Sequence, residues 1–268
     1  MTLEPDPKPL YLEPEAPLHI GVEGPALHIE HEDGRDQYLP LRRISRIIAH
    51  ERVQFDTEAL LTITRRGIPI LIHSDEHPHA RIIGPAPHPA SLRQRFIDLL
   101  ARPDWEDRYR DWQRAMHHRI ATVLAHRLKA PKSLANDPEA LRTWIEKQVE
   151  KESDEETRRK TAYRFRQLNL AWMQQRLLQH GFGGEEETLL HDTIDLPARL
   201  GRLLDDRTQT IRLGWLRRRR RWAEKRNAPL PGVSEKQIVR VYEKDAARIA
   251  RLGNDIINRL HRWLVSIQ

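Results

Sequence analysis

The sequence predicts an α+β protein in which a small N-terminal β-rich domain is followed by an all-helical C-terminal domain. Three observations support this fold class. Short apolar bursts of strand length fill residues 18–85, a proline-rich stretch follows at 84–89, and helical spacing of apolar residues begins at Ser91. We therefore expect a β-rich domain at 18–85 and a helical domain at 86–268.

The N-terminal end is predicted to be a leader followed by a β-hairpin. Residues 1–17 are rich in proline and acidic side chains, which indicates a flexible leader. Strand-like bursts follow at 18–22 and 26–31. The next segment, Glu32-Asp33-Gly34-Arg35, contains an Asp-Gly pair that supplies the positive φ angles of a hairpin turn.

Residues 39–85 contain an unusual order of elements in a short length. An apolar run at 39–48 is followed by a short helical pattern that ends at Gly67. Two further apolar runs, at 68–72 and 80–83, have the length and branching of buried strands. The segment therefore predicts a compact β-rich unit with one short helix laid across it.

The remaining sequence has helical periodicity. Ser91 is a candidate N-cap for the first helical segment, whose apolar pattern continues to Leu128, and Asn136-Asp137 is a cap for the next helix. Later helices are predicted at 137–150, 154–180, 195–204, 207–226 and 234–267.

The composition excludes several classes of protein. The chain has no cysteine, which rules out disulfides, thiol catalysis and cysteine-ligated metal sites. No apolar run is long enough to span a bilayer, and the N-terminus lacks the pattern of a signal peptide. The adjacent pair His117-His118 would point about 100° apart on a helix and cannot easily share one ion. We expect a cytoplasmic protein without a membrane partner.

The net charge of +7 favours a polyanionic partner, because Lys and Arg release counterions from phosphate backbones. Five consecutive arginines are flanked by Trp215 and Trp222. Aromatic rings interleaved with guanidinium groups are typical of nucleic-acid binding, although a basic run is also typical of a solvated helix face. The residues predicted to bind nucleic acid are Arg212, Arg217, Arg218, Arg219, Arg220, Arg221 and Lys225.

Four collinear segments resemble one known family. They are Pro40-Leu41-Arg42-Arg43-Ile44-Ser45-Arg46-Ile47, Asp56-Thr57-Glu58-Ala59-Leu60, Arg66-Gly67-Ile68-Pro69-Ile70 and Ala80-Arg81-Ile82-Ile83-Gly84-Pro85. On these segments, residues 18 to about 128 resemble the CRISPR adaptation integrases, the endonucleases that insert new spacers into a CRISPR array. The resemblance implies a role in antiviral defence, a homodimer formed through the β domains, binding to double-stranded DNA, and a small adaptation subunit as a second partner.

The resemblance also implies metal-dependent strand transfer. Family members hold a divalent metal, Mg²⁺ or Mn²⁺, with a Glu, a His and an Asp from different helices, and the metal activates a hydroxyl for attack on phosphate. The matching positions in this sequence are Glu156, His191 and Asp205.

Each of these three residues also has a structural interpretation. Glu156 lies in a charge run that is typical of a solvated helix face, and His191 could belong to a helix cap. Asp205-Asp206 could begin a helix, where acids interact favourably with the helix dipole. Besides an active integrase, the sequence therefore permits an inactive relative that binds nucleic acid or partner proteins. A third alternative is a general helical nucleic-acid module with an unrelated β domain.

Overall fold

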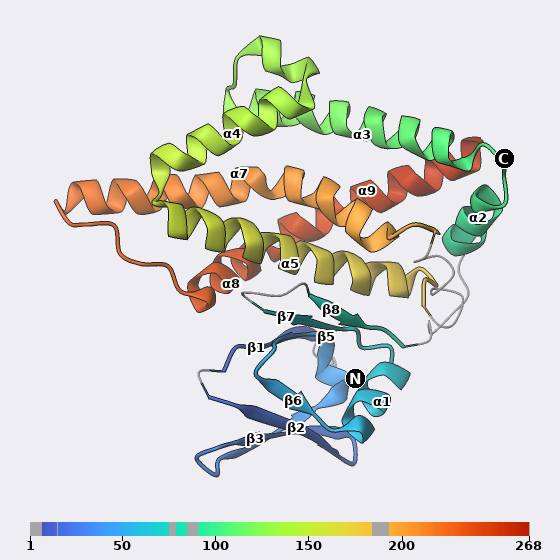
Figure 1. Cartoon of the computed structure of the whole chain (residues 1–268), viewed down its shortest axis with the longest axis vertical. Coiled ribbons are helices and arrows are strands. Elements are labelled where there is room, and N and C mark those ends of the chain that lie inside the picture. The colour runs from blue at the N-terminus through green and yellow to red at the C-terminus, as the bar shows by residue number, and fades with distance from the viewer. Residues whose placement is uncertain (1–6, 15, 75–78, 85–90, 184–192, 268) are drawn as a thin grey trace, which may run out of the picture. The chain divides into compact units, whose positions relative to one another are not determined.

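The computed structural model describes residues 7–14, 16–74, 79–84, 91–183 and 193–267. Its strands lie between Lys8 and Ile82, and every described α-helix except the short one at Thr57–Arg65 follows them, which confirms the predicted α+β class (Figure 1). The described residues form two compact units, which we call the N-terminal unit (within 1–93 and 170–197) and the helical unit (within 94–169 and 198–268).

Part of the predicted helical domain therefore belongs to the N-terminal unit. Arg46 donates a hydrogen bond from Nη1 to Gln175 Oε1 at 2.6 Å. Arg81 forms two hydrogen bonds to the carboxylate of Asp195, at 2.9 and 2.6 Å. These long-range contacts explain why residues 170–197 group with the strands rather than with the other helices.

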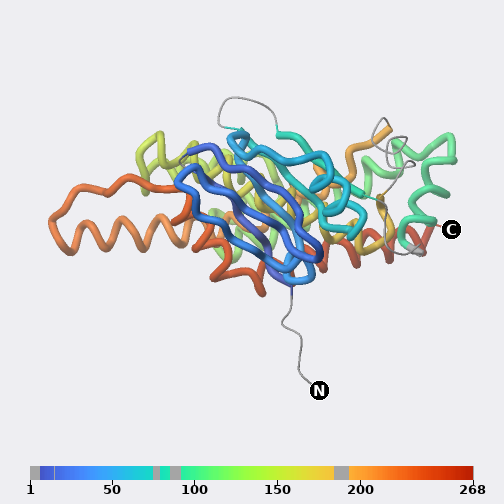
Figure 2. Tube along the Cα trace, turned by 90° about the horizontal axis from the view of Figure 1, so that it is seen from below, coloured from blue at the N-terminus to red at the C-terminus, as the bar shows by residue number. Residues whose placement is uncertain are grey.

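The N-terminal unit contains two four-stranded sheets, with strand orders β1-β5-β7-β8 and β4-β3-β2-β6. Figure 2 shows these strands in blue to teal. Their bounds are β1 Lys8–Leu12, β2 Leu18–Glu23, β3 Ala26–His31, β4 Asp36–Pro40, β5 Ile44–His50, β6 Val53–Phe55, β7 Ile70–His73 and β8 Ala80–Ile82. The short helix α1 spans Thr57–Arg65, and a 3₁₀ turn, η1, spans Leu41–Arg43.

The flexible leader predicted at 1–17 is wrong for residues 8–12, which form β1. This strand pairs in parallel with β5, with Leu10 opposite Ile47. β1 is an edge strand, so the missing N–H of Pro9 is tolerated there. Leu12 is 6% exposed and belongs to the core, so apolar burial outweighs the proline-rich composition of this segment.

The predicted hairpin and helix are confirmed. β3 and β4 pair in antiparallel register around Gly34, whose φ is 75°. Helix α1 is followed by Gly67 with φ of 69°, a left-handed conformation that glycine adopts without steric cost. Both sheets and α1 contribute to one apolar core, in which Ile20, Ile47 and Ile63 are fully buried.

The helical half contains five longer helices and two shorter ones among the described residues, besides one 3₁₀ turn. Their bounds are α2 Ser91–Leu100, α3 Trp105–Leu128, η2 Lys132–Asn136, α4 Pro138–Glu152, α5 Glu155–Gln179, α7 Leu196–Lys225, α8 Glu235–Lys244 and α9 Ala246–Ser266. Asp137 caps α4 by accepting from the backbone N–H groups of Glu139 and Ala140, as its position predicts.

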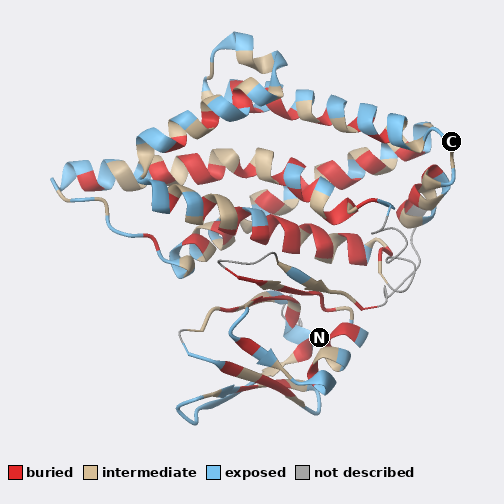
Figure 3. Ribbon diagram, viewed as in Figure 1, coloured by how far each residue is buried: buried red, intermediate tan, exposed pale blue. Residues whose placement is uncertain are grey.

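Three helical segments differ from the prediction, and the first of them, predicted from Ser91 to Leu128, is divided into α2 and α3. The helices predicted at 195–204 and 207–226 are one helix, α7, because the acids between them find side-chain partners instead of starting a new helix. The helix predicted at 234–267 is divided at Asp245 into α8 and α9. Figure 3 shows buried positions along α5 and α7 and a more exposed C-terminal end of α7. In the described part of the chain, no helix has the length and apolar character needed to cross a membrane.

Candidate functional site

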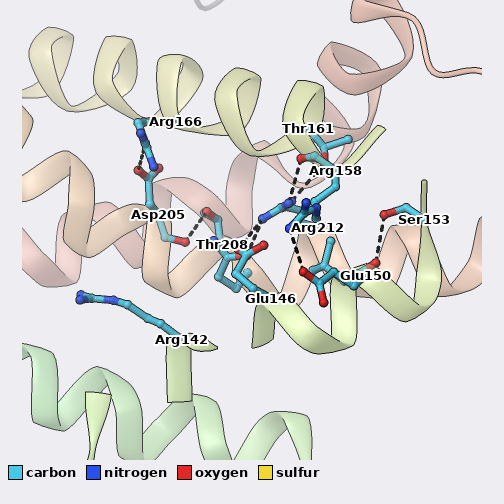
Figure 4. Close-up of polar contacts among 12 residues, drawn as sticks. Arg142, Glu146, Glu150, Ser153, Arg158, Thr161, Arg166, Asp205, Thr208 and Arg212 are labelled. Carbon is cyan, nitrogen blue, oxygen red and sulfur yellow. Dashed lines mark hydrogen bonds and ion pairs between the residues drawn. The ribbon is translucent and has the colours of Figure 1, made fainter. Parts of the chain in front are cut away.

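The middle of α7 carries two adjacent acids, Asp205 and Asp206. Asn169 on α5 donates from Nδ2 to Asp205 Oδ1 at 2.6 Å. Figure 4 shows the ion pair between Arg166 and Asp205, in which Arg166 Nε lies 3.6 Å from Asp205 Oδ2. The hydroxyl of Tyr242 on α8 fixes Asn169 by donating to its Oδ1 at 3.0 Å. Burial raises the pKa of Asp205 to about 7, although the bond from Asn169 and the charge of Arg166 oppose this shift.

Asp206 is held by side chains from two other helices. Arg142 on α4 donates from Nε to Asp206 Oδ1 at 3.0 Å and from Nη2 to Oδ2 at 2.6 Å. His117 Nδ1 on α3 lies 3.3 Å from Asp206 Oδ2 and 2.8 Å from Arg142 Nη2. Burial alone would raise the pKa of Asp206, but the bonds with His117 and Arg142 outweigh it and hold that pKa below its usual value.

Arg212, further along α7, is buried, with a side chain only 1% exposed. Its guanidinium donates to Thr161 Oγ1 at 3.2 Å, to the carbonyl oxygen of Arg158 at 3.0 Å and to Glu146 Oε1 at 3.2 Å (Figure 4). Burial lowers the pKa of Arg212, and Glu146 opposes this shift. The prediction that Arg212 contacts nucleic acid is therefore corrected: this arginine joins α4, α5 and α7 inside the helical unit.

A divalent metal would need the carboxylate oxygens of this region as ligands. The carboxylates of Asp205, Asp206 and Glu146 each face at least one guanidinium group instead. A second cation placed at the same oxygens would be repelled by those arginines. Among the described residues, no three His, Asp or Glu side chains gather in a way that could hold a metal ion. The described acids Asp205, Asp206 and Glu146 are therefore engaged by arginines and offer no free carboxylate pair to a metal.

The structure does not bring Glu156 and Asp205 together. The side chain of Glu156 is 69% exposed and lies 2.7 Å from Lys160, its i+4 neighbour on α5. Asn169, which contacts Asp205, lies about 20 Å further along the same helix. Glu156 thus has the surroundings of a charge on a solvated helix face. The third predicted residue, His191, lies outside the described residues.

The five consecutive arginines lie at the C-terminal end of α7, and three of them interact with acids of the chain. Arg217 is 3.4 Å from Glu152, and Arg220 is 2.8 Å from Glu224. Arg219 is half-buried; burial lowers its pKa, and the charge of Asp154 opposes this shift. These three side chains therefore have structural neighbours that limit their availability to a ligand.

The other basic side chains of this segment are exposed and available to bind a ligand. Arg218, Arg221 and Lys225 are exposed, and the described structure shows no ion pair for any of them. Trp222 is 46% exposed, and the guanidinium carbon of Arg226 stacks 4.4 Å from the centre of its ring. The helical spacing places Arg218, Arg221, Trp222 and Lys225 on one side of α7, and Arg226 directly follows that helix. We call these five residues the α7 basic face.

A model of the family described as CRISPR associated protein Cas1 matches residues 14–161, which is more than half of the chain. The chain belongs to the Cas1 family. This assignment confirms the resemblance to the CRISPR adaptation integrases and removes the alternative of an unrelated β domain. The matched residues include Glu156 and end before His191 and Asp205. A search of curated proteins found no match.

Solved structures share the fold of this Cas1-family chain at low sequence identity. A Cas1 protein from Thermotoga maritima is 11% identical, with a TM-score of 0.70 over 96% of this chain and 97% of that one. A casposase bound to its integration product is 14% identical, with a TM-score of 0.62 over 97% and 91%. A TtCas1–DNA complex is 11% identical, with a TM-score of 0.59 over 94% and 91%.

The residues that hold the acids of α7 could not be identified from the sequence. Arg142 and Glu146 belong to no motif, and their one sequence signal is an i,i+4 spacing that places both on one face of α4. His117 stands out only as part of the His117-His118 pair, for which a shared metal ion is not expected, and it pairs with Asp206. The partners of these residues lie far away in sequence, so only the folded chain identifies them.

Proposed function

We propose that this Cas1-family chain binds double-stranded DNA during spacer acquisition and acts there as an interaction subunit without metal-dependent strand transfer. The observation that carries the proposal is the pairing of Asp205, Asp206 and Glu146 with arginines of the same chain. In this arrangement guanidinium groups lie beside these carboxylates, and the pairs of Asp206 and Glu146 join α4 to α7, which supports a structural role for the acids.

Three observations support DNA as the ligand. The family model is that of a CRISPR-associated protein, and two solved structures of the same fold contain DNA or an integration product. The α7 basic face offers unpaired arginines together with an exposed Trp222. Free cations attract phosphates and an exposed aromatic ring can stack on a base, so this surface suits a nucleic acid.

The partner proteins belong to the same proposal. A homodimer formed through the N-terminal unit would bring two α7 basic faces to one DNA molecule, and a small adaptation subunit would join it to the integration complex. Light scattering after size exclusion tests the dimer: a mass twice that of the 31.6 kDa chain is expected, and a monomer at micromolar concentration would contradict it.

Metal-dependent strand transfer is the second candidate function, and membership in the Cas1 family favours it. Mg²⁺ or Mn²⁺ would supply activation of a hydroxyl and stabilisation of the leaving oxygen. Its residues would be Glu156, His191 and Asp205. The exposed position of Glu156 and the partners of Asp205 favour the first candidate instead.

A single assay separates the two functions. Wild-type protein, Glu156→Ala and His191→Ala are incubated with a branched DNA that carries a CRISPR repeat, in Mn²⁺ and in EDTA, while binding is followed by fluorescence anisotropy. We expect binding of the same strength in all three proteins and no metal-dependent nicked or joined product. A product that needs Mn²⁺ and disappears in His191→Ala would establish the second function.

A further inference from the structure

The helical unit contains a cavity of about 570 Å³ that the DNA-binding proposal does not use. It lies between the first half of α3, the N-terminal end of α4 and the N-terminal end of α7. Five arginines and two acids, Asp137 and Glu139, contribute to its lining, so positive charge prevails. The arginines are Arg110, Arg114, Arg142, Arg199 and Arg202.

The two arginines from α7 are available to a ligand. Arg199 and Arg202 are exposed, stand one turn apart on the helix, and have no ion pair in the part of the chain that the structure describes. Arg110 and Arg114 pair only with exposed acids on their own helix. Such surface pairs contribute little free energy, so a stronger anion can replace those acids.

Arg142 is already oriented for an anion. Its Nε and Nη2 bond to Asp206 and its Nη2 also lies against His117, so the guanidinium plane is fixed. Its Nη1 has no hydrogen bond within the described structure and belongs to a residue that lines the cavity. A fixed guanidinium loses less conformational entropy when it binds an oxyanion than a free one does.

The lining also indicates what kind of anion fits. Pro138 is the one apolar residue among those that line the cavity, and no phenylalanine, tyrosine or tryptophan side chain contributes. An apolar peptide anchor would therefore find almost no surface to pack on. Several converging arginines favour a compact group of high charge with several acceptor oxygens.

We propose that this cavity binds the terminal phosphate of a DNA end. A terminal phosphate carries a charge of about −2 at neutral pH and three free oxygens, whereas a backbone phosphodiester carries only one charge and two free oxygens. The inference rests on the proposed DNA binding and adds a preference to it: the chain distinguishes phosphorylated from unphosphorylated DNA ends.

The test uses a blunt-ended DNA hairpin with one free end, prepared with a 5′-phosphate, a 3′-phosphate or no terminal phosphate. We expect the wild-type protein to bind at least one phosphorylated form about tenfold more tightly than the unphosphorylated form, because the terminal phosphate adds charge-assisted hydrogen bonds to the arginines. The double variant Arg199→Ala/Arg202→Ala should bind all three forms within about twofold of one another and keep its affinity for the unphosphorylated hairpin.

A matched control removes the same charge elsewhere. Arg65→Ala/Arg66→Ala, at the C-terminal end of α1, changes two exposed arginines that lie outside the cavity and should keep the full preference. Equal binding of all three hairpins by the wild-type protein would overturn the end-phosphate site and leave the proposed function standing. A preference for phosphorylated hairpins that survives in Arg199→Ala/Arg202→Ala would overturn the end-phosphate site in the same way. Failure of the wild-type protein to bind any hairpin would instead overturn the proposed function.

Discussion

Arg142 on α4 holds the carboxylate of Asp206 on α7 with two nitrogens, Nε at 3.0 Å from Oδ1 and Nη2 at 2.6 Å from Oδ2. Two parallel hydrogen bonds of this kind fix the relative orientation of the two side chains as well as the distance between them. Arg212 and Glu146 form a second pair between the same helices at 3.2 Å. These two pairs give Asp206 and Glu146 a structural role, since each joins α4 to α7.

The first prediction concerns Arg142. In Arg142→Ala the carboxylate of Asp206, which is 16% exposed, loses both guanidinium bonds and keeps only His117. We expect the free energy of unfolding to fall by about 1–3 kcal/mol, because a largely buried charge loses its main partner. Urea denaturation measures the change. The control Arg110→Ala removes a more exposed arginine and should stay within about 0.5 kcal/mol of wild type; equal losses in both variants would contradict the role of Arg142.

The second prediction separates stability from DNA binding at Arg212. Arg212→Ala removes a buried side chain together with its hydrogen bonds to Thr161, Arg158 and Glu146, so we expect a loss of about 1–3 kcal/mol in unfolding free energy. Arg218→Ala, on the exposed side of the same helix, should change stability by less than about 0.5 kcal/mol. Thermal and urea unfolding compare the two. A fully stable Arg212→Ala that no longer binds DNA would restore Arg212 as a DNA-binding residue.

The third prediction concerns the α7 basic face. Arg218→Ala/Arg221→Ala removes two unpaired cations, so the slope of log K against log salt should become shallower by roughly 2, at about 0.9 for each phosphate that is no longer neutralised. Arg217→Ala/Arg220→Ala is the matched control, because those arginines already pair with Glu152 and Glu224. The slope of log K against log salt should change less in this control variant than in Arg218→Ala/Arg221→Ala. Anisotropy titrations between about 50 and 200 mM salt make the comparison, and identical slopes in the two variants would place the DNA elsewhere.

The fourth prediction follows from the raised pKa of Asp205, about 7 in the folded chain. Between its unfolded pKa near 4 and about 7, the folded state binds a proton that the unfolded state does not. Asp205 therefore contributes stability that is fully present below about pH 4 and is lost as the pH rises through about 7. Asp205→Asn cannot ionise, and its amide can still bond to Asn169.

Asp205→Asn should consequently be more stable than wild type at about pH 8, by at least about 3 °C in Tm, and should approach wild type at about pH 5. The comparison between the two proteins cancels the opposite contribution of Asp206, whose pKa is lowered and which loses stabilising bonds at acidic pH. Differential scanning calorimetry across this pH range measures both curves. A difference in Tm that stays constant across the range would show that Asp205 does not titrate there.

Much of the fold could be predicted from the residue patterns. The period-two bursts and the Asp33-Gly34 turn led to the strands, and the change of period at the prolines led to the helical half. The leader prediction failed for β1 because a short segment with Pro9 becomes a strand only when a partner such as β5 is present. The helix predicted to start near Asp205 failed for a similar reason, since the acids there bond to distant arginines.

Less of the candidate site than of the fold could be predicted from the sequence. The basic run and the family resemblance pointed to nucleic acid, but the run alone does not distinguish Arg218, which is exposed, from Arg217, which pairs with Glu152. Arg212 has the same residue type and lies on the same helix, yet it is buried. Within one helix, a side chain's surroundings depend on the neighbouring helices.

The sequence by itself determined the fold class, the family and the excess of positive charge, because these follow from periodicity, residue order and composition. Only the tertiary structure decided what the charged side chains do. It placed Arg142 against Asp206, Arg212 against Glu146, and Glu156 in solvent. A carboxylate is a metal ligand, a helix cap or half of an ion pair according to the groups within a few ångströms of it, and residues far apart in the chain supply those groups.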